Sequence, residues 1–345
     1  MDQSPQLPLV TAVVVDWNGG AMLEDALASL FAQTHGALEV ILVDNGSSDG
    51  AARAAATRHG DRLVYLRNDQ NTGFAHANNQ AFAIARGEWV FLLNNDAIAD
   101  PAAVAELVAA TAGEPDLGML ACRIVRHQEP NIIDSVGLLL YPDGVSRPRG
   151  WEEKDLGQYD RKERVLCPHG CAGLFRTSML RELGGFDEDF FCYLEDIDLG
   201  LRAQMLGYHC LYVPTSRVRH RKSASAGNYS KFKAYHVERN RIWVAAKCVP
   251  RFILFVSPFF TANRYLMQAY AAYTHQGLSG EFVKEYSYPQ LLVLLVRAYV
   301  SALWRLPRML RKRRAISRTR KLTVREWYGL ISRYKLDAIE LALKY

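Results

Sequence analysis

The sequence predicts an α/β fold: a mixed, mainly parallel sheet flanked by helices and followed by a C-terminal helical extension that associates with a membrane. Three observations predict it. Short apolar, β-branched runs alternate with segments of helical spacing in the N-terminal half, polar residues end several of these runs, and the last third becomes apolar and then basic. With 345 residues, of which 49% are hydrophobic, the chain can bury a large core and exceeds one compact domain.

The N-terminal half reads as repeated strand–helix units. Met22, Leu23, Ala26, Leu27 and Leu30 have the spacing of one buried helix face. Strands are expected at 9–16, 38–44, 62–68 and 88–94, and helices at 21–33, 51–59, 75–85 and from 101 onward. In parallel sheets covered by helices, ligands lie outside the carboxyl ends of the strands.

Three of these strands end in acidic or amide residues. Asp16 and Asp44 close the first two, and Asn94, Asn95 and Asp96 follow the fourth, so all should lie along one rim. No glycine-rich dinucleotide or P-loop motif follows the first strand. Because an acidic rim repels phosphate unless a cation mediates, the sequence predicts a Mg²⁺ or Mn²⁺ site with Asp96 as the carboxylate ligand. An ordinary polar turn is the alternative.

A second group of acids begins a predicted helix in the segment 184–208. Apolar residues at helical spacing place Glu195, Asp196 and Asp198 in its first turn, after an aromatic approach. An ionised carboxylate at the edge of a cleft is what a general base requires. A helix merely capped by acids is the alternative.

A third candidate is His220, which follows a strand-like run. Neutral imidazole is a good ligand for a divalent ion. Arg219, Arg221 and Lys222 around it indicate that a diphosphate binds nearby. A lone loop histidine without a role is the alternative.

The six cysteines show no paired C-x-x-C spacing, which argues against a zinc knuckle and against a disulfide framework. The one local cluster, Cys167 and Cys171 with His169 between them, is interpreted as packing. The N-terminus resembles no signal segment, so the catalytic part is expected in the cytoplasm.

The C-terminal third concentrates the positive charge. Ten Lys and Arg and no acid lie between Arg305 and Arg325, although the whole chain carries only +6. The preceding apolar stretch is interrupted by Arg297, so it is expected to lie in a membrane interface rather than to span a bilayer; a helix packed on the main domain is the alternative. Tyr299 and Trp304 are the predicted headgroup anchors. The region 291–325 should therefore meet an anionic membrane surface; a solvated face and a nucleic-acid site are the alternatives.

Seven motifs occur in the order found in the family 2 inverting glycosyltransferases of GT-A fold, and the sequence most resembles their bacterial rhamnosyltransferase branch. The resemblance covers roughly residues 9–249, taken as the catalytic domain, 1–249, ahead of a helical region, 250–345. The motifs are VVVDWNG, VILVDNGSSDG, NTGFAHANNQAF, FLLNND, CAGLFRTSMLRELGGFDEDFFCYLEDIDLGLRAQMLGY, VRHRKSAS and ERNR. The family's fold is a Rossmann-like sheet flanked by helices.

The resemblance implies roles for particular residues. Asp96 matches the last acid of the family's D-x-D element and His220 a histidine that completes the metal site. Asp196 matches the catalytic base, with Glu195 alongside it. The residues expected along the nucleotide sugar donor are Asp16, Asp44, Gly73, Asn78, Asn95 and Asp96.

The resemblance also implies a reaction and partners. The donor is a nucleotide diphosphate sugar, with dTDP-rhamnose preferred, and the acceptor a saccharide carried on a polyprenyl lipid at the cytoplasmic face of the inner membrane. Dimerisation through the C-terminal region is left open. A sugar-phosphate nucleotidyltransferase is the rival enzyme class, but Asp16 to Gly20 offers no cation for a triphosphate. A non-catalytic sugar-nucleotide-binding protein of the same fold is the other rival.

Overall fold

The computed structural model describes residues 7–221, 230–274 and 285–343. The strands are β1 (Val10–Asp16), β2 (Leu38–Asp44), β3 (Val64–Arg67), β4 (Trp89–Leu93), β5 (Ala97–Ala99), β6 (Leu117–Arg126), β7 (Ile133–Ser135), β8 (Leu138–Leu140), β9 (Ser146–Pro148), β10 (Glu163–Val165), β11 (Ala172–Arg176) and β12 (His209–His220). The helices are α1 (Ala21–Phe31), α2 (Ala51–His59), α3 (Phe74–Ile84), α4 (Ala103–Ala109), α5 (Thr177–Leu183), α6 (Glu195–Met205), α7 (Lys231–Cys248), α8 (Arg251–Tyr273), α10 (Tyr288–Trp304), α11 (Leu306–Thr319), α12 (Val324–Arg333) and α13 (Ala338–Leu343). Two short 3-10 turns are η1 (Gly60–Arg62) and η2 (Glu188–Phe190).

The central sheet has ten strands, with the order β10-β12-β6-β11-β4-β1-β2-β3 and with β5 and β7 paired at its margin. The four predicted N-terminal strands are present and parallel, and Asp16 faces Asp44 in the β1–β2 register. Their acidic ends therefore share one rim, as predicted. The sheet is mixed because β11 runs antiparallel between β4 and β6. This reversal brings the turn before β11 beside the end of β4, where the N–H of Asn94 donates to the carbonyl of Cys171 at 2.8 Å.

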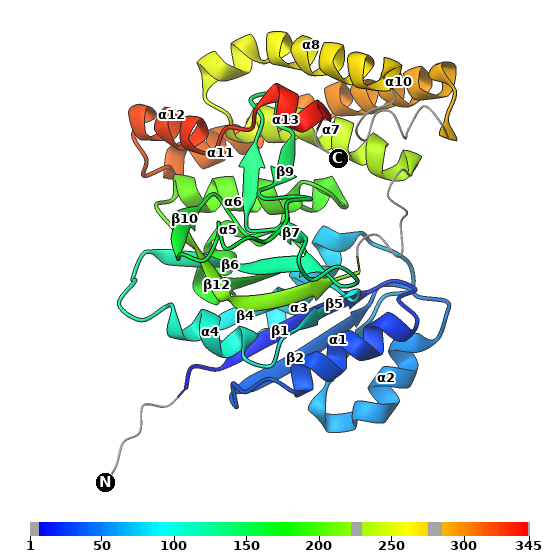
Figure 1. Ribbon diagram of the computed structural model, residues 1–345, viewed down its shortest axis with the longest axis vertical. Helices are drawn as coiled ribbons and strands as arrows, with labels where there is room; N and C mark the ends of the chain where they lie inside the picture. Colours follow the sequence, from blue (N-terminus) through cyan, green and yellow to red (C-terminus); the bar gives the residue numbers. More distant parts are fainter. Residues whose placement is uncertain (1–6, 222–229, 275–284, 344–345) are drawn as a thin grey trace.

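Helices cover both faces of the sheet (Figure 1). One face packs apolar residues of β1, β2 and β4 against α1, α2 and α4. The other face packs alternate residues of the same strands against α3, α5 and α6. The alternation follows from the two-residue period of a strand. The α/β architecture predicted from sequence is thus confirmed; the last predicted helix of the N-terminal half begins at Ala103 rather than at 101.

The C-terminal helices share the second of these cores. Trp327 of α12 and Met309 of α11 belong to the same buried cluster as Trp243 of α7. The indole N–H of Trp327 donates to the carbonyl of Cys248 at 3.0 Å, and that of Trp243 to the carbonyl of Ala302 at 3.1 Å. The division at residue 249 stays a prediction about sequence organisation, since the packing continues across it.

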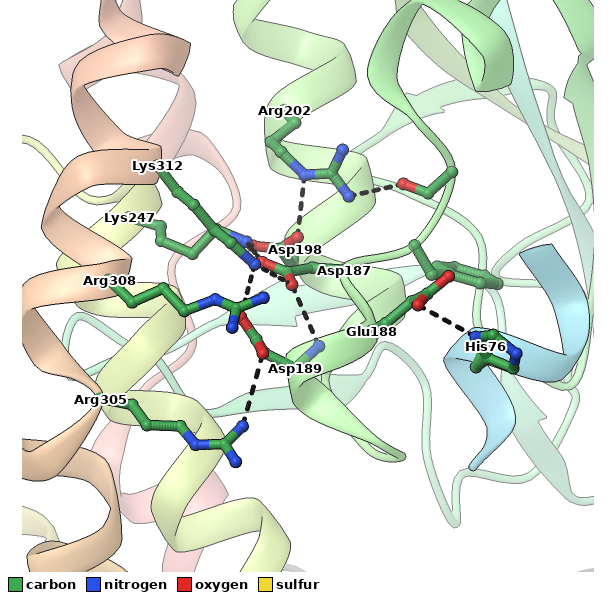
Figure 2. A network of polar contacts seen from close by, with 12 residues as sticks. His76, Asp187, Glu188, Asp189, Asp198, Arg202, Lys247, Arg305, Arg308 and Lys312 are labelled. Carbon is green, nitrogen blue, oxygen red and sulfur yellow. Dashed lines mark hydrogen bonds and ion pairs between the residues drawn. The ribbon is translucent and has the colours of Figure 1, made fainter. Parts of the chain in front are cut away.

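Ion pairs hold α11 against the turn that leads to α6 (Figure 2). Arg308 and Lys312 lie 2.7 and 2.6 Å from Asp189, and Lys312 also pairs with Asp187. Five of the ten cations in the basic run contact other parts of the molecule: Arg305, Arg308, Lys312, Arg313 and Arg320. Part of the basic run is therefore a docking surface within the chain.

The helix α8 buries a charged residue and exposes a large apolar face. Its buried Arg264 donates to Glu238 of α7 at 2.7 Å and to Asp143 at 2.8 Å. Burial opposes ionisation of Glu238, but Arg264 and Arg241 outweigh it and lower the pKa of Glu238 to about 2. The outer face exposes large apolar side chains: Phe252, Phe255, Phe259, Leu266 and Tyr270. This is the reverse of the usual arrangement in water.

The helix α10 is apolar on both sides: it buries Leu294, Ala298 and Ala302 and exposes Leu292, Val293, Val296 and Val300. Tyr299, predicted to point outward, instead faces inward, where its hydroxyl meets the Tyr265 hydroxyl at 3.1 Å and the Arg241 guanidinium. Trp304 is 85% exposed, as a headgroup anchor requires. Among the described residues no single helix has the length and apolarity to cross a bilayer; α10 and α11 meet that criterion only as a pair bent by 53°.

Candidate active site

The buried carboxylate of Asp16 ties three strand ends together. One oxygen accepts from Asn95 Nδ2 at 2.7 Å and the other from Ser47 Oγ at 3.1 Å. A Cβ at Gly19 would come within 2.2 Å of Asp16, so only glycine leaves room for this bond. Burial raises the pKa of Asp16, and the hydrogen bonds from Asn95 and Ser47 oppose that shift. Asp16 lies on the predicted rim, but it is buried there and holds Asn95 and Ser47 in place.

Asp44 is similarly engaged. Its oxygens accept from the Ser47 N–H and from the Tyr65 hydroxyl, each at 2.8 Å. Burial, followed by this hydrogen bond, raises the pKa of Tyr65 to about 12. Asp44 is 3% exposed, so it too lies in the predicted place with its oxygens already used.

Asn45, which the sequence analysis did not single out, fixes the next loop. Its Oδ1 accepts from Asn68 Nδ2 at 3.0 Å and from the Thr72 N–H at 3.1 Å. Its Nδ2 donates to Asn71 at 3.1 Å. The one signal in the sequence was its position directly after Asp44.

Gly73 and Asn78 begin α3. Gly73 has φ 90°, and a Cβ there would meet the ring of Phe191 at 2.6 Å. Because Gly73 has no side chain, the loop that leads to α6 can pack against it. The prediction from sequence placed the nucleotide at this position. Asn78 is fully buried and donates to the carbonyl of Phe74 at 2.8 Å, so the structure does not bring it to the open rim.

Asp96, His220 and Asp134 form a line at the end of β4. His220 Nδ1 lies 2.7 Å from Asp134, and its Nε2 lies 3.3 Å from Asp96 Oδ1. All three side chains are buried, and this oxygen of Asp96 has no well-formed hydrogen bond. Antiparallel pairing of β7 with β6 places Asp134 here, and no motif in the sequence marked it.

This arrangement favours a cation between His220 and Asp96. If Nδ1 donates to Asp134, the lone pair on Nε2 of a neutral ring faces the Asp96 carboxylate across 3.3 Å. Without a metal, burial lowers the pKa of His220, but Cys171, Asp134 and Asp96 outweigh it and hold that pKa well above its usual range, which favours the protonated ring; a bound cation would displace the Nε2 proton. A histidine whose second nitrogen is held by a carboxylate is a common metal-ligand arrangement.

Asp96 and His220 have suitable chemistry for a Mg²⁺ or Mn²⁺ ion, but they are too few to complete its coordination. Asp96 and His220 supply two ligands of suitable chemistry. Within 7–221, 230–274 and 285–343, no group of three or more His, Cys, Asp or Glu side chains is arranged to hold a metal. The remaining ligands would therefore come from donor phosphates and water, as is usual for Mg²⁺.

The arginines around His220 are matched by nearby acids. Arg219 lies 3.4 Å from Asp100, and Arg221 lies 2.5 Å from Asp25. Lys222, the third cation predicted to await a diphosphate, lies outside the described residues. The diphosphate site on these arginines stays a prediction; both guanidinium groups are partly exposed in their ion pairs.

Asp196 lies at the start of α6, as predicted. Its Oδ2 accepts from the Gly170 N–H at 2.9 Å, and its Oδ1 from the Ile197 N–H at 2.7 Å. Glu195 is buried with one oxygen unpartnered, and burial followed by the charge of Asp196 raises its pKa well above the usual range. Of the two acids, Asp196 is therefore the one placed to act as an ionised base.

His169 lies near both His220 and Asp196. Its ring lies 6.4 Å from the ring of His220, and its pKa is lowered by burial, against the opposing charge of Asp196. Cys167 and Cys171 are buried in the two apolar clusters, so the predicted packing role of this cluster is confirmed. The turn between them also lies next to Asp196, through the Gly170 N–H, and next to His220, through the His169 ring.

Replacing Asp134 by asparagine tests the role of this line. The amide oxygen of the variant could still accept from His220 Nδ1, but without the charge, so we expect Mn²⁺ affinity to fall by about 10–100-fold. The measurement is Mn²⁺ titration followed by electron paramagnetic resonance. Asp25→Asn, an equal change at an exposed ion pair nearby, is the control. Equal affinity in Asp134→Asn and the parent would contradict the assignment.

Comparison with known proteins adds independent information. A family described as "Glycosyltransferase like family 2" matches residues 5–246. The N-acetylglucosaminyl-diphospho-decaprenol L-rhamnosyltransferase of Mycobacterium tuberculosis is 31% identical over 252 residues, which cover 66% of this chain and 81% of that protein.

Two solved structures show a similar fold. The mannosyltransferase PcManGT of Pyrobaculum calidifontis, in complex with GDP-Man and Mn²⁺, has a TM-score of 0.55 at 22% identity, covering 87% of this chain and 88% of that one. S. aureus TarS 1-349, in complex with UDP, has a TM-score of 0.52 at 15% identity and covers 94% and 91% of the two chains.

Proposed function

Because the chain belongs to glycosyltransferase family 2 and has the GT-A fold, we propose that it is a metal-dependent inverting enzyme that transfers a sugar to a polyprenyl-linked saccharide. The preferred donor is dTDP-rhamnose, because the mycobacterial relative is an L-rhamnosyltransferase. Because the chain belongs to this family, the sugar-phosphate nucleotidyltransferase is no longer a candidate.

One observation carries the proposal. The turn at 169–171 donates from the Gly170 N–H to Asp196 and carries His169, whose ring lies 6.4 Å from that of His220, the partner of Asp96; the proposed base and the proposed cation pair are thus neighbours of one turn. A donor diphosphate at Asp96 would leave its anomeric carbon on the side of Asp196. An inverting transfer needs the leaving group and the base on opposite sides of the anomeric carbon.

Each residue then has a definite task. Asp196, oriented by two backbone N–H groups, accepts the proton of the acceptor hydroxyl as its oxygen attacks the anomeric carbon. Attack comes from the face opposite the diphosphate, so the configuration inverts. Asp96 and His220 would hold the divalent ion, which, when bound, neutralises charge on the diphosphate leaving group. Asp134 orients His220.

A nucleotide-sugar screen tests the donor and the metal together. We expect the matched nucleotide diphosphate sugar to stabilise the protein by about 2.7 kcal/mol at a hundredfold excess over its Kd, and to do so only with Mn²⁺. Asp96→Ala should lose the metal-dependent part in a thermal-shift measurement, while Asp25→Ala should keep it. Stabilisation that is equal without metal would contradict metal dependence; proton NMR of the product would report inversion or retention.

The exposed apolar faces of α8 and α10 support a location on the membrane. The outer faces of α8 and α10 expose apolar side chains at the end of the molecule farthest from β1 to β3 (Figure 1). Arg311, Arg314 and Arg318 of α11 are exposed beside them. Apolar insertion plus attraction to anionic lipid describes a peripheral membrane protein. The proposed membrane face thus includes α8 as well as the predicted 291–325; a dimer through the same face is the competing outcome in a vesicle-sedimentation test.

A further inference from the structure

A shallow groove runs between α7 and α10. It consists of two adjoining hollows, of 530 and 460 Å³, that share Tyr235 and Arg297. The first hollow reaches Lys231, Phe232 and Val293, and the second reaches Val296, Val300 and Trp304.

The first hollow borders the loop that carries the general base. The ring of Phe232 lies 6.4 Å from that of Tyr193 and 6.1 Å from that of Phe191. Both aromatic residues lie in the short loop immediately before Glu195 and Asp196. One end of the groove therefore lies beside the loop that precedes the candidate base.

The groove changes character along its length. The end near the active site and the middle carry cations, Lys231 and Arg297, whereas the far end is formed by Val296, Val300 and Trp304. Across 7–221, 230–274 and 285–343, Arg297 has no carboxylate or hydrogen-bond partner. An unpaired guanidinium next to the apolar end of the groove suits a phosphate group attached to a hydrocarbon chain.

We propose that this groove binds the polyprenyl diphosphate part of the acceptor, which rests on the proposed function. Arg297 and Lys231 hold the diphosphate, the sugar extends past Phe232 toward Asp196, and the prenyl chain follows Val296 and Val300 to Trp304. The order of charge and apolar surface matches the order of the three parts of such a lipid. The far end continues into the exposed face of α10, so the chain can enter from the bilayer.

Binding of geranylgeranyl diphosphate, a soluble prenyl diphosphate, tests this site directly. The full chain is titrated in EDTA, with tryptophan fluorescence as the readout. We expect Arg297→Gln to weaken binding by about tenfold, the effect of one charge-assisted hydrogen bond, and Val300→Asp to weaken it comparably. Arg311→Gln removes an equal, exposed charge from α11 outside the groove and should leave binding unchanged.

Several results would overturn the proposal. One is an equal loss in Arg297→Gln and Arg311→Gln, which would indicate general surface electrostatics. Another is displacement of the prenyl diphosphate by dTDP or UDP, which would place it in the donor site. A third is equally tight binding of geranylgeraniol, which lacks the diphosphate.

Failure of the groove and failure of the function are distinguishable. Metal-dependent donor binding with no prenyl diphosphate binding rejects the groove alone. Prenyl diphosphate binding that depends on Arg297, with no nucleotide sugar bound, rejects the glycosyltransfer proposal and keeps the lipid site.

Discussion

Asp196→Asn is expected to lower the rate of sugar transfer by about 10²–10⁴-fold, because the amide cannot take the acceptor proton. Its Oδ1 can still accept one of the two backbone N–H bonds that now orient the side chain, from Gly170 and Ile197. The Kd of the donor should stay close to the parent value. Single-turnover transfer kinetics and equilibrium donor binding measure the two quantities separately.

Two controls accompany this substitution. Glu114→Gln makes the same chemical change at an exposed turn and should leave both quantities unaltered. Glu195→Gln should cost much less than Asp196→Asn, because burial already favours the neutral form of Glu195. If Glu195→Gln instead removed activity and Asp196→Asn did not, the base would be Glu195.

The sequence predicts those site residues that end a strand or begin a helix. Asp16, Asp96 and Asp196 are of this kind, because local periodicity places them at element termini and topology then collects the termini on one rim. Asp134 and His169 are different. They reach the site through the antiparallel strands β7 and β11, and nothing local indicates that these strands reverse direction.

The interpretation of the C-terminal helices failed in a second way. Tyr299 was expected to point outward because tyrosine and tryptophan prefer the headgroup level of a membrane. Instead, the Tyr299 hydroxyl meets that of Tyr265 in a buried polar network with Arg264 and Glu238, while the outer sides of α8 and α10 expose apolar side chains. Sequence periodicity shows that a helix has two faces, but it does not show which solvent each face meets.

Replacing Lys247 by methionine should destabilise the protein by about 3–5 kcal/mol, the usual cost of removing one partner from a buried ion pair. Lys247 is 1% exposed and lies 2.7 Å from Asp198, and it also pairs with Asp187 (Figure 2). Methionine keeps most of the apolar stem but leaves both carboxylates short of a charge. Urea unfolding, followed by circular dichroism, measures the loss.

The matched control lies on the exposed rim of the same network. Arg308→Gln removes a guanidinium that is 56% exposed and 2.7 Å from Asp189, so it should cost no more than about 1 kcal/mol. Losses of equal size in Lys247→Met and Arg308→Gln would show that burial does not govern the strength of this network.

The same network predicts a dependence of stability on pH. Burial alone would raise the pKa of Asp187, but Lys247 and then Lys312 outweigh it and leave that pKa well below its usual range. A carboxylate with a lowered pKa stabilises the fold above its unfolded pKa of about 3.9, and this stabilisation is lost as the pH falls through the folded value. Lys247 has a raised pKa, because Asp198 and Asp187 outweigh its burial, so its contribution is lost as the pH rises beyond about 10.4. The free energy of unfolding of Lys247→Met should therefore change less with pH than that of the parent, at both low and high pH.

Because Asp187 and Asp198 flank the loop that leads to Asp196, the Lys247→Met variant should also lose transfer activity before it unfolds.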